Sequence, residues 1–304
     1  MSSNPRPASD RHPAGCSCHA CDHAEELTAA TPNSELELEQ SGRLDPTETT
    51  TIQRDLARFL RGRIADLNAD VRALIVDDDV FGLGETDGEW EDLPRGVQLE
   101  QFNQWLSEAS SQDVLNRLDT ETVRAFFERA AASGIRDGHA DLREFDVETD
   151  DVDDVLAQDA VQEQIEERHS TLQDRVGTSV DDYGRDVSRI VGAGLGANVG
   201  RREIAKGITE RSRVYQSHVT SQASGEVVNQ YTTTQLTSYD RVDAEVELSV
   251  DVEYVDAGDD KVCQRCLALS GQTWTLERAQ EEDPIPVHGY CRCRFRVTDV
   301  QKLF

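Results

Sequence analysis

Residues 259–295 read DDKVCQRCLALSGQTWTLERAQEEDPIPVHGYCRCRF, and the spacing of the cysteines in this stretch constrains the C-terminal structure strongly. A Cys-x2-Cys pair lies near its start, His-x2-Cys repeats that spacing later, and one more cysteine follows. One tight turn lets the two thiolates of a Cys-x2-Cys pair bind the same ion, so we expect a zinc site. The candidate metal ligands are Cys263, Cys266, His288, Cys291 and Cys293.

Four of these five groups would complete a tetrahedral zinc site, and the spacing admits two sets. One set joins Cys263 and Cys266 to His288 and Cys291, and the other replaces His288 by Cys293. In a strand from residue 291 onward, Cys291 and Cys293 would lie on the same face. The strand period therefore does not show which of the two ligand sets binds the ion. A pair of disulfides and free thiols are the alternatives. A segment of about 45 residues with few large apolar side chains needs a cross-link of this kind.

Apolar and polar residues alternate strictly from Val242 to Tyr254, ahead of the cysteines. Period 2 indicates a strand with one buried face. In the second expected strand, Arg292, Arg294 and Arg296 share the face opposite to the cysteines. We expect these arginines to pair with acids of the first strand, and a phosphate-binding row is the alternative. The acids are Glu245, Glu247, Asp251 and Glu253.

The region before this strand shows helical spacing of its apolar residues. The sequence Asp45-Pro46-Thr47-Glu48 places an acid at the N-cap, proline at N1 and glutamate at N3, and predicts a helix to about Val76. Two more helices are expected around residues 98–117 and 120–132. Residues 137–182 hold sixteen acids against three arginines, 3 − 16 = −13, and their apolar residues recur about every four positions. We expect one long solvated helix there.

The glycine-rich stretch from Gly192 to Gly200 lacks the Gly-Lys-Ser/Thr of a P-loop, so we interpret it as a hinge or a tight packing point. A helix is expected over residues 201–235. Residues 184–213 contain seven basic and three acidic side chains, 7 − 3 = +4. We expect them to pair with the acidic segment 137–182, and a phosphate-facing surface is the alternative.

Together these patterns predict an α+β fold that is mostly helical over its first two thirds and ends in a small antiparallel β module with a Cys/His zinc-type cross-link. Residues 1–45 are expected to form a disordered tail, 46–183 an α-helical region, and 184–304 a further domain. That domain would contain the helix 201–235 and a β/zinc module at 242–300, which we expect to fold independently. In the tail, Cys16, Cys18, Cys21 and His23 are candidates for a second metal site.

The composition argues against several classes of protein. The net charge is −29 and the isoelectric point is near 4.5, which disfavours a protein that coats nucleic acid nonspecifically. No apolar run approaches the roughly 18–20 residues of a membrane helix, and the N-terminus lacks the apolar stretch of a secretory signal. Lysine occurs only at Lys206, Lys261 and Lys302, and an acidic chain almost without lysine fits a salt-loaded cytoplasm.

The cysteine-rich stretch resembles the C-terminal signature of the Mu F-like head morphogenesis proteins, the minor head proteins of tailed viruses. An acidic pair precedes Cys-x2-Cys, a leucine and a glycine follow, and Pro-x-Pro-x-His-x2-Cys-Arg-Cys completes the pattern. The residues that carry the resemblance are Asp259, Asp260, Cys263, Cys266, Leu269, Gly271, Pro284, Pro286, His288, Cys291, Arg292 and Cys293. Arg211-Ser212-Arg213 stands where the family has an Arg-Thr-Glu element.

The resemblance implies a structural protein that is present in low copy inside the viral head. During assembly, the protein would be located in the host cytoplasm. The resemblance also implies viral portal and capsid proteins as partners, with weak contact to packaged DNA as a further expectation. Together with the composition, it suggests a tailed virus or provirus of a haloarchaeon. The alternative function is a zinc-dependent nucleic-acid-binding module or nuclease. We expect no enzyme, because no nucleophile lies in a recognisable elbow and no carboxylates pair near a histidine.

Overall fold

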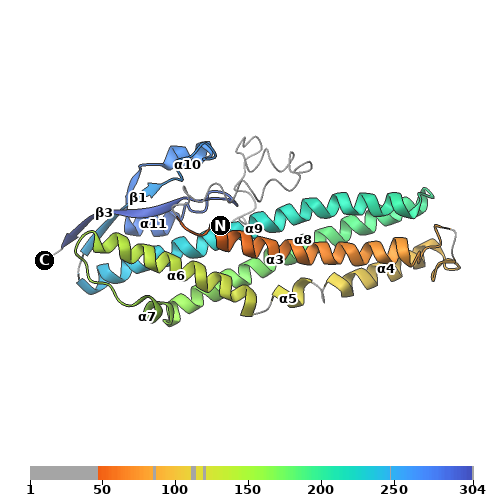
Figure 1. Cartoon of the computed structure of the whole chain (residues 1–304), viewed down its shortest axis with the longest axis horizontal. Helices are drawn as coiled ribbons and strands as arrows, with labels where there is room; N and C mark the ends of the chain where they lie inside the picture. Colours follow the sequence, from red (N-terminus) through yellow and green to blue (C-terminus); the bar gives the residue numbers. More distant parts are fainter. Residues whose placement is uncertain (1–46, 85–86, 111–113, 119–120, 247, 303–304) are drawn as a thin grey trace, which may run out of the picture.

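Apolar residues at helical spacing generate the long helices of the protein. The structure is a computed structural model, and it describes residues 47–84, 87–110, 114–118, 121–246 and 248–302. Figure 1 shows these helices running side by side along the long axis, with a small sheet near one end. The helical elements of this bundle are α3 (Thr50–Arg72), the π-helical turn η3 (Ala73–Asp77), α4 (Arg95–Ser110), α5 (Asn116–Leu118), α6 (Glu121–Arg143), α7 (Val152–Leu156), α8 (Asp159–Gly196) and α9 (Arg201–Val246).

The C-terminal module, residues 248–302, contains a three-stranded antiparallel sheet in the order β2-β1-β3. Its elements are β1 (Leu248–Val255), α10 (Gln264–Leu269), β2 (Thr273–Thr275), α11 (Leu276–Glu282) and β3 (Arg294–Lys302). Val250, Val252 and Tyr254 are buried on one face of β1, as period 2 predicts. Tyr254 lies opposite Phe295 of β3, and their rings pack edge to face. The α+β class and the antiparallel sheet are confirmed.

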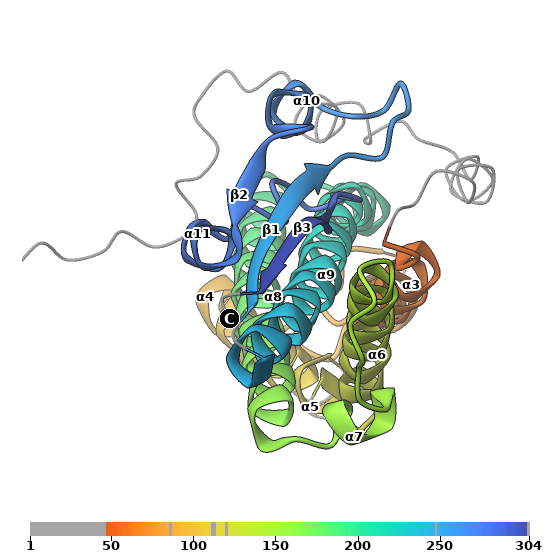
Figure 2. The same ribbon diagram turned by 90° about the vertical axis from the view of Figure 1, so that its left-hand side faces the viewer.

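Helix α9 is the element that the bundle and the sheet share. It packs against α3, α6 and α8 on the bundle side and against β1, β3 and α11 on the module side. Figure 2 shows the sheet lying on α9, with the other bundle helices beyond it. A helix surrounded in this way is ordinarily apolar on all sides, yet many buried residues of α9 are polar. They are Ser212, Ser224, Glu226, Gln230, Thr232, Thr234, Gln235 and Ser238.

Hydroxyl side chains can be buried in α9 because several of them use the helix's own carbonyl groups. The Thr234 hydroxyl donates to the Gln230 carbonyl at 2.9 Å, and the Ser238 hydroxyl donates to the Thr234 carbonyl at 2.9 Å. These bonds to the preceding turn satisfy the polar group without an outside partner. The side chains are also small, so neighbouring helices approach α9 closely.

The closest approach is that of α6. A Cβ atom at Gly134 would lie 2.2 Å from the Tyr231 carbonyl oxygen, and one at Gly138 would lie 3.1 Å from the Ser238 side chain. Glycine at these positions therefore sets the distance between the two helices. At the turn between α8 and α9, a Cβ at Gly194 would meet the Ile204 side chain at 2.6 Å. The interpretation of the glycine-rich stretch as a tight packing point is confirmed for this residue.

The first helix begins later than expected. Asp45 and Pro46 lie outside the described residues, and α3 starts at Thr50. Glu48 has a φ of +53°, so it cannot occupy the third position of a helix. The chain enters the helix through Thr49, whose hydroxyl bonds to Thr47 at 2.7 Å and accepts from Gln53 at 2.8 Å. The N-terminal cluster of cysteines and histidine also lies outside the described residues.

The helix expected over 201–235 and the two expected strands have different bounds. The prediction that the first strand starts at residue 242 was wrong, because α9 continues to Val246 and β1 begins at Leu248. Valines 242 and 246 are four apart and so fit a helix as well, and extending an existing helix requires no new nucleus. Cys291 and Cys293 precede β3, which starts at Arg294 rather than at residue 291.

The acidic segment 137–182 is not one helix. It comprises the end of α6, the short helix α7 and the first part of α8, and α8 buries an apolar face. The boundary expected at residues 183 and 184 falls within α8. No helix among the described residues combines the length and apolar character needed to cross a membrane.

The basic segment 184–213 pairs mostly with other partners than expected. Arg189 and Arg211 contact Asp186, and Arg201 contacts the buried Asp79 at 3.3 Å. Among the ion pairs of the described chain, the one between Arg185 and Asp182 reaches the acidic segment. The prediction that the basic residues of 184–213 pair mainly with the acidic segment 137–182 is therefore wrong. Asp186 lies close to the arginines because α8 and α9 run antiparallel after the short turn.

The substitution Gly134→Ala tests the contact between α6 and α9. Overpacking a closed contact costs about 1–3 kcal/mol, so we expect the free energy of unfolding to fall by that amount. Gly62→Ala is the matched control, because nothing lies within 4 Å of a Cβ at that site in α3. There the better helix propensity of alanine should raise stability by up to about 1 kcal/mol. Denaturant unfolding in one salt buffer measures both, and equal effects would contradict the close approach.

Candidate metal centre

Cys263 and Cys266 are brought together by the first turn of α10. Cys263 is the N-cap residue, with φ −73° and ψ 157°, and its sulfur accepts from the Cys266 backbone N–H at 3.5 Å. The same turn places the two sulfur atoms 3.5 Å apart. The Cys-x2-Cys spacing thus forms the tight turn expected from the sequence.

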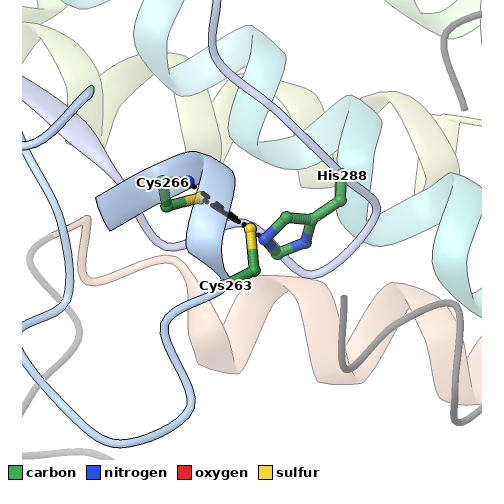
Figure 3. Close-up of side chains that lie close together, drawn as sticks. All are labelled: Cys263, Cys266 and His288. Atoms are coloured by element: carbon green, nitrogen blue, oxygen red, sulfur yellow. Dashed lines mark hydrogen bonds between the residues drawn. The ribbon is translucent and has the colours of Figure 1, made fainter. Parts of the chain in front are cut away.

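His288 reaches this pair from the loop between α11 and β3. Its Nε2 atom lies 3.5 Å from the Cys266 sulfur, and Figure 3 shows the ring directed at the two cysteines. The loop is held against the bundle at the next residue, because a Cβ at Gly289 would lie 2.7 Å from the Ser221 carbonyl oxygen of α9. Helix α9 therefore helps to set where His288 stands.

Cys291 and Cys293 complete the cluster from the segment that leads into β3. The ligand atoms of Cys266, Cys291 and Cys293 all lie within 4.8 Å of one another, as do those of Cys263, Cys266 and His288. Cys266 belongs to both groups. The four cysteines are 0–7% exposed, and all four are free thiols. The structure therefore places the five expected ligand residues in two groups of three that share Cys266, and it does not form the alternative disulfides.

The cluster fits a zinc ion in its donor chemistry and its spacing. Zinc prefers thiolate and imidazole ligands, and a Zn–S bond of about 2.3 Å makes the edge of the tetrahedron about 3.8 Å long. The Cys263–Cys266 and Cys266–His288 separations are both 3.5 Å, close to that edge. Burial of the thiols is typical of a structural site, since a catalytic site keeps an open position for water.

The thiols influence one another's protonation. Hydrogen bonds to Cys291 and Cys293, together with burial, raise the pKa of the Cys266 thiol. The hydrogen bond from Cys266 lowers the pKa of Cys291 well below its ordinary value. Neighbouring buried thiols cannot all lose their protons at neutral pH, because the negative charges would repel one another. A divalent cation removes that repulsion, and binding it releases the protons.

A salt bridge joins the two chain segments that supply the cysteines. Arg292 donates two hydrogen bonds to Asp259, at 2.6 and 2.8 Å, and both side chains are largely buried. These hydrogen bonds hold the pKa of Asp259 below its ordinary value. The bridge fixes the loop before Cys263 against the segment between Cys291 and Cys293. Both residues belong to the signature, but their sequence separation gave no sign that they pair.

Arg294 attaches the module to the bundle. It contacts Asp141 at 3.1 Å and Asp137 at 3.8 Å, and both carboxylates lie on α6. Each also accepts a hydrogen bond of 2.6 Å from a tyrosine of α9, Tyr239 for Asp141 and Tyr231 for Asp137. Burial raises the pKa of both carboxyl groups, although Arg294 counteracts this. The C-terminal module is therefore joined to the bundle by ion pairs, and its independent folding stays a prediction.

The arginine row forms structural pairs, as expected, but with partly different acids. Arg296 pairs with Glu253 of β1 at 2.9 Å, as the strand register predicts. Arg292 and Arg294 instead use Asp259 and the two α6 carboxylates. Sequence reasoning missed Asp137 and Asp141 because they appeared only as members of a long acidic run. Their spacing of four residues on one helix was the available signal.

Comparison with known proteins yields no match to a family model, a curated protein or a solved structure.

Removing Cys263 and Cys266 tests the metal centre. We expect the purified protein to carry about one zinc per chain, and the double variant Cys263→Ser/Cys266→Ser to lose it, since structural sites need four ligands. The control Gln264→Ser/Leu267→Ser changes exposed neighbours in the same turn and should retain the ion. Elemental analysis of the three proteins measures the content. A metal-free wild-type protein that folds normally would contradict the site.

Arg294→Met tests the attachment of the module. Removing one partner of a buried ion pair costs about 3–5 kcal/mol, whereas the exposed pair of the control variant Arg296→Met contributes less than about 1 kcal/mol. Loss of the cation raises the pKa of Asp137 and Asp141 further in the folded state. The two carboxyl groups of the folded variant then bind protons more tightly than those of its unfolded chain. The loss of unfolding free energy relative to the wild type should therefore become smaller as the pH falls from about 7 to about 5. Denaturant unfolding at both pH values measures this, and equal costs for the two variants would contradict the arrangement.

Proposed function

We propose that this chain is a structural minor head protein of a tailed virus, acting in head assembly at or near the portal. The observation that carries the proposal is the convergence of the signature residues. Asp259 and Arg292 bridge to each other beside five clustered metal-ligand candidates. Residues of the family-like pattern that are scattered over 35 positions (293 − 259 + 1) thus serve one local structure. A shared structural purpose supports the resemblance more strongly than spacing alone.

The shape of the bundle supports an architectural role. Helix α9 has 46 residues and is therefore about 70 Å long, and α8 has 38 residues. A rod of this length with a compact module near one end suits a protein that spans between neighbouring subunits of an assembly. Viral portal and capsid proteins are the partners proposed here, inside the head and, during assembly, in the host cytoplasm.

Zinc in this proposal has a structural role. The buried thiols leave little room for a substrate, and a closed four-ligand site holds chain segments together without further chemistry. The ion would join α10 to the segment before β3, next to the bridge between Asp259 and Arg292. The acidic, lysine-poor surface fits particles that assemble in molar salt, which supports a haloarchaeal host.

A zinc-dependent nuclease or nucleic-acid-binding module is the alternative function for this centre. A nuclease would need a catalytic histidine beside the ion. Within the described residues, neither group of ligand atoms contains a histidine other than His288, itself a candidate ligand. This distribution favours the structural role over the enzymatic one.

Protein counting in purified virus particles tests the proposal. We expect mass spectrometry to find the chain in low copy relative to the major shell protein. A virus that carries Cys263→Ser/Cys266→Ser should form few infectious particles, while one with Gln264→Ser/Leu267→Ser should assemble normally. Absence of the chain from intact particles would refute a role as a head component.

A further inference from the structure

An open pocket of about 570 Å³ lies where the end of α3 meets the first turns of α9, and four basic side chains line it. They are Arg72, Arg202, Lys206 and Arg213, and one acid, Glu210, faces them. The net charge of the ionisable side chains that line the pocket is 4 − 1 = +3. In a chain of net charge −29, a concave surface of this sign stands out from its surroundings.

Three of these cations have no ionic partner within the described chain. Arg72, Arg202 and Arg213 are exposed, and Lys206 reaches Glu203 at 3.7 Å. Their sequence neighbours behave differently: Arg201 pairs with Asp79, and Arg211 pairs with Asp186. The segment 184–213 therefore contains two sets of basic side chains, one used within the fold and one left at the pocket.

The cations of α9 form a row along one face of the helix. Arg202, Lys206 and Arg213 are four and seven residues apart, so they recur near the helical period. At 1.5 Å per residue the row is about 16 Å long. A single small anion would occupy only part of it. Along one strand of a nucleic acid, phosphates follow one another about every 3.4 Å of helix axis, so a row of this length spans several of them.

We propose that this pocket binds the phosphate groups of a nucleic-acid backbone. Arginine forks hold phosphate oxygens with paired hydrogen bonds, and three of the four cations are arginines. No aromatic side chain lines the pocket among the described residues, so the contact reads the backbone and not the bases. The inference goes beyond the proposed function, because the pocket lies on the bundle and does not use the metal centre.

Binding of labelled DNA to the full chain tests the inference. The probes are a fluorescent 12-nucleotide single strand and the matching duplex, followed by anisotropy from low to molar KCl. The variant Arg202→Gln/Arg213→Gln should bind at least about ten-fold more weakly at low salt, and the slope of log affinity against log salt should fall by about 1–2. Thermal unfolding and zinc content verify that the variant is folded.

The matched control is Arg58→Gln/Arg136→Gln, which removes the same charge from exposed positions. Arg58 lies fourteen residues before Arg72 on the same run of helix, about 21 Å away, and Arg136 lies on α6, which contacts α9 around Tyr231 rather than at the pocket. This variant should bind within about two-fold of the wild type, since it loses only distant charge. An equal loss in both variants would show a nonspecific charge effect and would overturn the assignment.

Competitors identify the ligand class. Pyrophosphate and poly-glutamate are titrated against the labelled strand. Displacement by unlabelled DNA at much lower concentration than by either competitor supports a backbone site. Binding of pyrophosphate without binding of DNA would assign the pocket to small phosphates, and preference for poly-glutamate would assign it to an acidic protein. Either result overturns the proposal, and neither bears on the presence of the chain in virus particles.

Discussion

The burial of helix α9 on nearly every side over residues 223–239 is the constraint on which the rest of the structure depends. Three bundle helices and the sheet of the C-terminal module all pack against it. Such a position favours a helix that is narrow and that can bury short polar side chains. Thr234 and Ser238 meet both conditions, because their hydroxyls bond to carbonyl groups one turn earlier and their side chains are short. Glycines on the facing helix then allow the close approach, and a chain of modest apolar content still forms a packed core.

The candidate metal centre derives its geometry from this arrangement as well as from its own spacing. One face of α9 holds the loop that carries His288, and tyrosines of the same helix bond the α6 carboxylates that receive Arg294. The bridge between Asp259 and Arg292 then connects the two cysteine-bearing segments. The Asp259–Arg292 and Arg294–Asp141 pairs are largely buried, so removing one partner of either pair is costly. The module therefore forms a cap on the bundle, and the candidate metal ligands lie within this cap.

Much of the fold was predictable where one periodicity extends over many residues. The long helices, the buried face of β1 and the clustering of Cys263, Cys266, His288, Cys291 and Cys293 all follow from spacing. Prediction failed at boundaries, where two periods compete over a few residues, as in the passage from α9 to β1. It also failed for charge partners. The acids of α6 looked like part of a solvated run, and only the docking of β3 shows that Asp141 is buried and Asp137 half-buried beside Arg294.

The sequence by itself determined the class of fold and the five candidate metal ligands, because these depend on local spacing and residue type. The tertiary structure alone decided which charges meet. Ion pairing depends on distances between segments that lie 25 to 153 residues apart in the sequence, and one sequence pattern is compatible with many such arrangements. For that reason the basic side chains of segment 184–213 could not be divided in advance into those paired within the fold and those left at the pocket. Packing directs Arg201 and Arg211 to buried or half-buried acids and leaves Arg202 and Arg213 at an open pocket.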